Sequence, residues 1–425
     1  MTIDSGFLKI LKKDVCPDAF VRELPARPDT VFIDGQVKLM KSNAITTWNL
    51  FMRVQFQSTI RKSFETGTDV VVLGFDDYTY VPRSKTMTQQ KRNKVQPVME
   101  FNEEDDLPKY MPVEWMSAMR NRTFKVKVIK RVIMDVKSWF ADMVSTDAGW
   151  SERTLVIDFH DMPDVVGRPL AEDRVPEYVK TETFVGRGEC DIKAYSWMPV
   201  SKCILLDSID GDYLPLTLLQ QERGGGTCDA WLRRMVTNVG VKRTAGEAKE
   251  GRSREYEFVS VNMLYAKLLE VMPSTQQSPI RQFCSLVAMC GCDFAMSLPR
   301  LGPSTLWTER HHVRNLNLGD PEHMLCALGT MYSHLFVAKG TPVCAKDADA
   351  EKMYARTLKR IQSSSKVSQR IREALWSPER AAAHTQNVAW TMLYWTLLQQ
   401  CPDPLAGGFG YTRDAKGRTH FAYAV

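Results

Sequence analysis

Residues 30–34 read Thr-Val-Phe-Ile-Asp, and residues 70–76 read Val-Val-Val-Leu-Gly-Phe-Asp. Both are short apolar runs rich in β-branched residues, which is typical of strands buried on both faces of a sheet. Two further runs, residues 154–157 and 203–206, have the same character and are also followed at once by aspartate. Because amphipathic helical stretches lie between the runs, the sequence predicts an α/β fold with a mainly parallel, twisted sheet flanked by helices.

Aspartates therefore stand at the ends of four predicted strands, at positions 34, 76, 158 and 207. The carboxyl ends of parallel strands meet at one edge of a sheet, where ligands of α/β proteins bind. An aspartate after a strand is also a common turn residue. Asp158 and Asp207 are interpreted in this second, structural way, as are His160 and Asp161.

Other acids complete a candidate metal site. Acid-x-acid pairs occur at 189–191 and 210–212, and another aspartate follows the helix predicted for residues 279–290. Carboxylate oxygens are the ligands that Mg²⁺ prefers, and two such ions can activate water and stabilise a leaving oxygen in phosphodiester hydrolysis. The predicted metal ligands are Asp34, Asp76, Glu189, Asp191, Asp210, Asp212 and Asp293.

The composition excludes several classes of protein. The chain has 425 residues, of which 44% are hydrophobic and 25% charged, as in soluble globular proteins and not in disordered or coiled-coil ones. No apolar run approaches the roughly 20 residues that span a bilayer, and the first residues lack a signal-peptide core. An intracellular protein is expected. The net charge of +6 does not by itself indicate a partner.

The ten cysteines are too sparse for a disulfide scaffold. Cysteines 190, 203, 284, 290 and 292 lie in apolar stretches and are expected to be reduced core thiols. The seven histidines are scattered, and His311-His312 has no cysteine at ligand spacing, so no zinc site is predicted.

Five motifs in order resemble the flap endonuclease/XPG family of structure-specific 5′ nucleases, which have a PIN-like fold. They are Val-Phe-Ile-Asp-Gly at 31–35, Phe-Asp-Asp at 75–77 with Lys85 and Lys91-Arg92 beyond it, the two acid-x-acid pairs, and Gly-Cys-Asp-Phe at 291–294 with Gly302-Pro303. The chain departs from the family at Met40, where a base-stacking tyrosine is common, and at Pro299-Arg300, which replaces a usual glycine. These departures indicate a divergent member, such as a viral one.

The resemblance implies roles for the site residues. Asp34, Asp76 and Asp191 would hold one Mg²⁺, and Asp210, Asp212 and Asp293 a second, with Glu189 bridging or in the outer shell and Mn²⁺ as a substitute. Lys85 and Arg92, which a helix would place on one face, would be catalytic residues that contact the scissile phosphate. A helix–two-turn–helix motif at about 279–310, with K⁺, would grip duplex backbone through Leu301, Gly302, Ser304 and Thr305.

The resemblance also implies the domain organisation. A nuclease domain would cover residues 1–345, and the irregular stretch at about 82–130 would be an arch-like insertion in it. Residues 346–425 would form a helical C-terminal segment that ends in a hairpin. Its aromatic residues Trp390, Tyr394 and Trp395 are interpreted as packing residues, with base stacking as the alternative. No motif for docking a sliding clamp is present.

The predicted function is a monomeric, divalent-metal-dependent 5′ nuclease. It would cut flap, branched or nicked DNA during replication or repair, in the nucleus or a viral replication compartment. One alternative is an RNA endonuclease with the same active site, of the viral mRNA-degrading type. The other is a catalytically inactive scaffold that binds nucleic acid, which is disfavoured because all seven acids are present.

Overall fold

The computed structural model describes most of the chain. The described residues are 4–40, 45–77, 98–159, 163–181, 188–208, 210–236, 255–272, 277–292, 295, 297–313, 317–318, 320–337, 349–397, 403–406, 408–413 and 419–421. No helix among them is long and apolar enough to cross a membrane.

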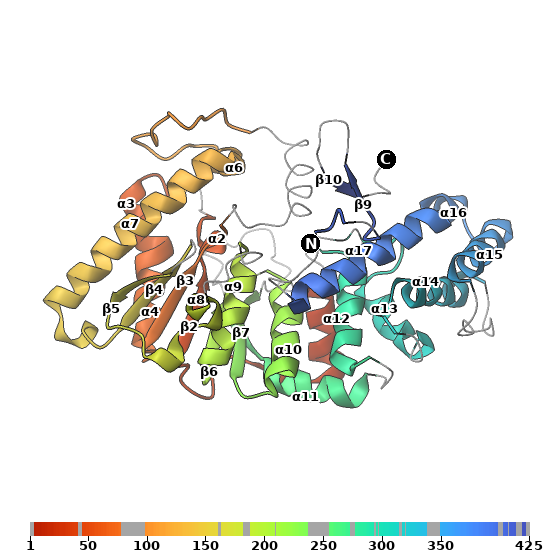
Figure 1. The fold of residues 1–425 in the computed structure, drawn as a ribbon, viewed down its shortest axis with the longest axis horizontal. Coiled ribbons are helices and arrows are strands. Elements are labelled where there is room, and N and C mark those ends of the chain that lie inside the picture. The colour runs from red at the N-terminus through yellow and green to blue at the C-terminus, as the bar shows by residue number, and fades with distance from the viewer. Residues whose placement is uncertain are drawn as a thin grey trace, which may run out of the picture.

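An eight-stranded sheet forms the centre of the fold (Figure 1). In spatial order the strands are β1 (Phe20–Val21), β8 (Glu255–Ser260), β7 (Asp229–Val236), β6 (Cys203–Asp207), β2 (Thr30–Asp34), β3 (Val70–Gly74), β4 (Thr154–Asp158) and β5 (Asp164–Gly167). Strands β7, β6, β2, β3 and β4 are mutually parallel, whereas β1, β8 and β5 pair antiparallel at the edges. The predicted α/β class with a mainly parallel sheet is confirmed, and it is consistent with a PIN-like fold.

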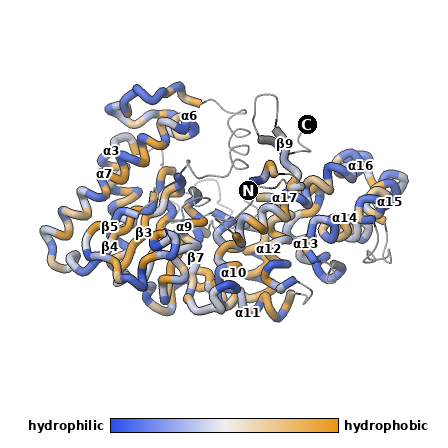
Figure 2. Tube along the Cα trace, viewed as in Figure 1, coloured by the Kyte–Doolittle hydropathy of each residue, from blue (hydrophilic) through white to orange (hydrophobic). Residues whose placement is uncertain are grey.

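Alternate side chains of each central strand enter two different cores. In β2, Val31 and Ile33 belong to one buried cluster and Phe32 to the other. This division follows from the two-residue period of a strand. Strand β3 and helix α12 (Pro279–Met289) are predominantly hydrophobic in Figure 2, as elements buried on both sides should be.

Helices pack on both faces of the sheet. The first core contains α3 (Trp48–Phe51), α4 (Ser58–Glu65), α6 (Trp115–Arg120) and α7 (Arg122–Thr146). The second contains α1 (Asp4–Ile10), α9 (Cys190–Trp197), α10 (Tyr213–Gly224), α11 (Val261–Val271), α12, α13 (Pro303–Glu309), α14 (Pro321–Phe336), α15 (Ala350–Ser363) and α17 (Pro378–Leu397). Three short helices are α2 (Gly35–Lys38), α8 (Glu177–Lys180) and α16 (Gln369–Ala374).

Helix α12 begins as the sequence predicts. Ser278 accepts a hydrogen bond from the Arg281 backbone N–H at 3.2 Å, and Pro279 occupies the first helical position. The predicted C-terminal hairpin is confirmed as β9 (Tyr411–Arg413) paired antiparallel with β10 (Thr419–Phe421).

The irregular stretch is shorter than predicted. Residues 98–114 form no helix or strand, but α6 and the first third of α7 occupy residues 115–130. Phe124, Val128, Val132 and Val136 recur every four residues on α7 and are fully buried. This apolar stripe packs α7 against the sheet, and the basic residues of the same segment obscured it in the sequence.

The C-terminal segment shares the second core instead of forming a separate one. Trp390, Tyr394 and Trp395 of α17 are each 1% exposed or less. Their interpretation as packing residues is confirmed, and base stacking by them is excluded. The five cysteines expected to be reduced are free thiols.

Candidate metal centre

The strand order reverses beside β2. The chain runs from β2 outward to β3 and β4 and then returns to β6, on the other side of β2. In open α/β sheets, ligands bind beyond the carboxyl ends of the strands at such a reversal. Asp34 is the last residue of β2, and Ser208 follows β6. The Ser208 hydroxyl donates to Asp34 Oδ2 at 2.8 Å, so the two strand ends are joined across this point.

Asp34 is fixed by the helix that follows it. Its Oδ1 accepts hydrogen bonds from the backbone N–H groups of Gln36, at 2.9 Å, and Val37, at 3.3 Å. Helix α2 can begin here because residue 35 is glycine: a Cβ would lie 2.4 Å from the Phe75 ring and 2.6 Å from the Gly74 carbonyl oxygen. The missing side chain at Gly35 thus lets α2 pack close to β3. The N–H groups of α2 then hold the Asp34 carboxylate in one orientation.

The end of β3 receives the first acid-x-acid pair. Asp76 Oδ1 accepts a hydrogen bond from the Cys190 backbone N–H at 3.0 Å, and the Asp77 N–H donates to the Gly188 carbonyl at 2.6 Å. These two bonds dock the start of α9 on β3. Glu189 and Asp191, which are 1% and 8% exposed, are thereby brought to the same edge of the sheet as Asp76.

The second acid-x-acid pair lies in the turn after β6. The Asp210 N–H donates to Ser208 Oγ at 3.1 Å, and the Asp212 N–H donates to Asp210 Oδ1 at 3.3 Å. Ser208 thus contacts both Asp34 and the turn that carries Asp210. Asp210 is exposed and Asp212 is half-buried at the start of α10, so this pair faces solvent more than Asp34 does.

The pKa of Asp34 reflects its burial and its acidic neighbours. Burial raises the pKa of Asp34 to about 6, and the charges of Asp76 and Asp210 add to the increase. Beneath them, burial raises the pKa of the Cys190 thiol and of the Tyr213 hydroxyl well above their usual values. These two side chains are therefore neutral and add no negative charge beside the acids.

The aspartates at the strand ends differ in whether a lysine or arginine side chain pairs with them. Asp207 forms ion pairs with Lys38, at 2.8 Å, and with Arg233. Asp158 lies 3.5 Å from the Lys193 ammonium, and its structural interpretation agrees with this pairing. In the described part of the chain, no lysine or arginine pairs with Asp34, Asp76 or Asp210.

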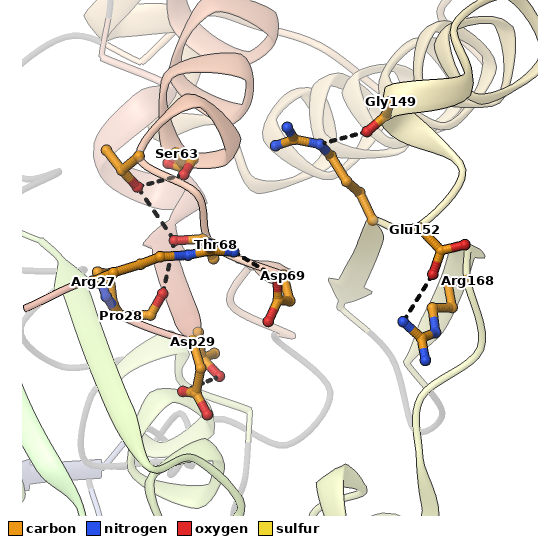
Figure 3. A network of polar contacts seen from close by, with 12 residues as sticks. Arg27, Pro28, Asp29, Ser63, Thr68, Asp69, Gly149, Glu152 and Arg168 are labelled. Carbon is orange, nitrogen blue, oxygen red and sulfur yellow. Dashed lines mark hydrogen bonds and ion pairs between the residues drawn. The ribbon is translucent and has the colours of Figure 1, made fainter.

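The opposite edge of the sheet has a different character (Figure 3). Asp69, before β3, pairs with Arg27 at 2.7 Å, and Glu152, before β4, pairs with Arg168 at 3.0 Å. Acids at this amino edge thus have basic partners. Carboxylates without a basic partner gather instead at the carboxyl edge, where a cation would bind.

Lys193 is a residue near the site that the sequence analysis missed. It is 3% exposed, and its ammonium donates to the carbonyl oxygens of Phe75, at 2.9 Å, and Phe159, at 2.7 Å. It therefore joins the carboxyl ends of β3 and β4 directly behind Asp76. The available signal was its position two residues after Asp191, on a helix of otherwise mostly apolar side chains.

The remaining predicted residues fall into two groups: those outside the described part of the chain and those at the start of α13. Asp293, Lys85 and Arg92 lie outside the described residues. Gly302 is the N-cap of α13, and both it and Ser304 are exposed. Thr305 is half-buried, whereas the Leu301 side chain is 1% exposed and lies in the core.

Arg300 occupies the place of a glycine in the turn before α13. Its φ of 62° is in the left-handed region, where glycine is favoured.

The acids fit hard divalent cations. Their donors are all oxygen, and Asp34, Asp76 and Asp210 have no basic partner in the described part of the chain. Among the described residues, however, no three of these carboxylates have oxygens within 4.8 Å of one another. Asp34, Asp76 and Asp210 come from three separate strand ends, with Glu189, Asp191 and Asp212 on the adjoining segments.

Comparisons with known proteins find similarity to solved structures. No protein-family model matches the chain, and no curated protein matches it. Among solved structures, the chain is similar to the catalytic core of Rad2 in complex with a DNA substrate, with 13% sequence identity and a TM-score of 0.37 over 91% of this chain and 94% of that one. At this TM-score the similarity supports no conclusion about activity, and the fold rests on the strand order described above.

Proposed function

We propose that this protein is a divalent-metal-dependent nuclease. The observation that supports the proposal is the placement of Asp34, Asp76 and Asp210 at the carboxyl ends of neighbouring strands, where the strand order reverses and where none of the three has a basic partner among the described residues. Such a set of carboxylates is suited to holding Mg²⁺ against a phosphodiester. The motifs that resemble flap endonucleases point to the same chemistry from the sequence.

In this proposal Asp34, Asp76 and Asp191 hold one ion, and Asp210, Asp212 and Asp293 hold the second, with Glu189 beside them. When bound, the ions supply an activated water and stabilise charge on the leaving oxygen. The chain itself contributes orientation. Ser208 ties Asp34 to the Asp210 turn, and the α2 N–H groups fix the Asp34 carboxylate, so few side chains must rearrange during catalysis.

The proposed substrates are flap, branched or nicked DNA. Lys85 and Arg92 would neutralise charge on the scissile phosphate, and the exposed start of α13, with Gly302 and Ser304, would contact duplex backbone through its N–H groups. The nuclear or viral location and the monomeric state remain predictions. RNA carries the same phosphodiester, so RNA belongs among the substrates tested.

The test is cleavage of 5′-labelled flap, gapped and duplex DNA and of single-stranded RNA, with Mg²⁺ or with EDTA. Wild-type protein should cut a branched DNA substrate with Mg²⁺ only. Asp34→Asn and Asp210→Asn should each lower the single-turnover rate by more than the roughly 10–100-fold typical of residues that only orient metal ligands.

Asp69→Asn is the matched control, because it removes the same charge at the opposite edge of the sheet, where the side chain is 65% exposed. It should cleave at the wild-type rate. Rates of Asp34→Asn and Asp210→Asn within tenfold of wild type would contradict the metal assignment. Cleavage of RNA alone would retain the nuclease chemistry and replace the proposed substrate.

A further inference from the structure

A glutamate and two histidines converge where helix α13 meets the end of α14. Glu309 is the last residue of α13, His312 lies in the 3-10 turn that follows, and His334 lies in the last turn of α14. One ligand atom from each lies within 4.8 Å of the other two. None of the three belongs to the acid cluster at the sheet edge.

The local structure explains this convergence. Glu309 and His312 are three residues apart in a helical segment, so their side chains share one face. The His312 Nε2 lies 3.8 Å from Glu309 Oε2, and the centroids of the His312 and His334 rings are 3.8 Å apart. Helix α14 brings His334 to this point.

One carboxylate oxygen of Glu309 lacks a hydrogen-bond donor in the described part of the chain. The side chain is 12% exposed, and its Oε2 is buried without a hydrogen-bond partner there. The neighbouring Arg310 interacts with Trp307 instead. Its guanidinium lies 3.9 Å from the centroid of the Trp307 ring and donates to the Trp307 carbonyl at 2.6 Å. A buried carboxylate oxygen without a partner is costly, so a bound cation would stabilise this arrangement.

The helix ends also favour a cation. Glu309 ends α13, and His334 lies near the C-terminus of α14. Carbonyl groups at helix C-termini carry partial negative charge, which attracts positive charge to both segments.

We propose that Glu309, His312 and His334 bind one transition-metal ion, with Zn²⁺ as the ion best matched to the site. Two imidazole nitrogens and one carboxylate oxygen form a donor set typical of zinc, whereas Mg²⁺ prefers oxygen ligands alone. His312 is 46% exposed, so water completes the coordination. The ion joins the segment after α13 to α14 and stabilises the region that begins with the exposed Gly302 turn.

The experiment uses the full chain, stripped with a chelator and then equilibrated with Zn²⁺ in an excess of Mg²⁺ that occupies the acid cluster. Bound zinc is counted by elemental analysis after gel filtration. Wild-type protein should retain one equivalent of zinc more than His312→Ala or His334→Ala. Zinc should also raise the thermal unfolding midpoint of wild-type protein and of neither variant.

Two controls make the result specific. His311→Ala removes the adjacent histidine, which is outside the cluster, and should bind zinc as wild type does. Asp34→Asn should also keep the zinc, so failure of the proposed nuclease function and failure of this site are distinguishable. If His334→Ala does not fold, His312→Ala decides the matter, because its side chain is largely exposed. Equal zinc content in wild type and His312→Ala would overturn the proposal.

Discussion

At the scale of single residues, Asp34 links the acid cluster to the stability of the protein. Its pKa is about 6 in the folded, metal-free protein against an ordinary value of 3.8. Between these values the folded protein binds more protons than the unfolded chain, so the stability contributed by protonated Asp34 is present below about pH 4 and is lost as the pH rises through 6. At about 1.4 kcal/mol per pH unit, the loss reaches about 3 kcal/mol at pH 7.

Asp34→Asn should therefore stabilise the metal-free protein at neutral pH. Asparagine keeps an oxygen for the α2 N–H groups and cannot ionise. We expect its free energy of unfolding in EDTA to exceed that of wild type by up to about 3 kcal/mol at pH 7. The excess should shrink as the pH falls from about 6 and should vanish near pH 4. Urea titrations between pH 4 and 7 measure the difference. A difference that stays constant with pH would show that the Asp34 charge is already compensated in the fold.

Lys193 shows what residue-level reasoning from sequence missed. The strand-end aspartates could be recognised as candidate ligands because an acid directly after an apolar run is visible in the sequence. A lysine that donates to the Phe75 and Phe159 carbonyls forms no pattern, because its partners are main-chain atoms far apart in sequence. The pairing of Asp207 with the Lys38 and Arg233 side chains was hidden because these residues are also far from Asp207 in the sequence.

At the scale of elements, the strands were predicted closely and the helices less so. The runs of β-branched residues located β2, β3, β4 and β6 because strands buried on both faces are continuously apolar. Helix α7 was largely missed because charged residues surround its apolar stripe, and only the four-residue spacing of Phe124, Val128 and Val132 indicates it. Ser278-Pro279 located the start of α12 because capping is local chemistry.

The turn before α13 offers a prediction at this scale. Arg300 is exposed and holds a left-handed backbone that costs a non-glycine residue about 1 kcal/mol. Arg300→Gly should leave the protein as stable or up to about 1 kcal/mol more stable. If the turn contacts duplex backbone, the same change should weaken DNA binding and reduce the slope of log affinity against log salt by about 0.9.

Binding titrations at several salt concentrations, beside urea unfolding, separate these two effects. Arg300→Lys is the matched control, because it keeps both the charge and the backbone strain and should keep the wild-type salt slope. An unchanged slope in Arg300→Gly would mean that this turn only connects α12 to α13.

At the scale of the whole molecule, the sequence predicted which strand ends carry acids but not how those acids are held. The parallel sheet brings Asp34, Asp76 and Asp210 to one edge because their strands are neighbours, and this follows from the order of elements. The Glu309, His312 and His334 cluster was not predicted, since His334 comes from a separate helix and no fixed spacing relates it to His312. Contacts between elements that share no sheet are the part that pattern reasoning leaves undetermined.

The same whole-molecule geometry predicts how Mg²⁺ affects stability. The acid cluster exists only when β2, β3 and β6 are paired, so the unfolded chain offers no comparable site. A ligand that binds only the folded state stabilises it by about 2.7 kcal/mol at a concentration 100-fold above its Kd. Mg²⁺ should therefore raise the urea midpoint of wild-type protein at pH 7, and Asp34→Asn and Asp210→Asn should each lose most of that rise.

Three controls isolate this effect. Sodium chloride at equal ionic strength should give a smaller increase, because it only screens the repulsion between the carboxylates. Asp69→Asn should respond as wild type does, since its side chain lies at the amino edge. His334→Ala should also keep the full response, because Mg²⁺ does not favour imidazole ligands. If sodium chloride stabilised the protein as much as Mg²⁺ does, the effect would be screening of the repulsion between carboxylates alone. The assignment of a metal site to these acids would then be wrong.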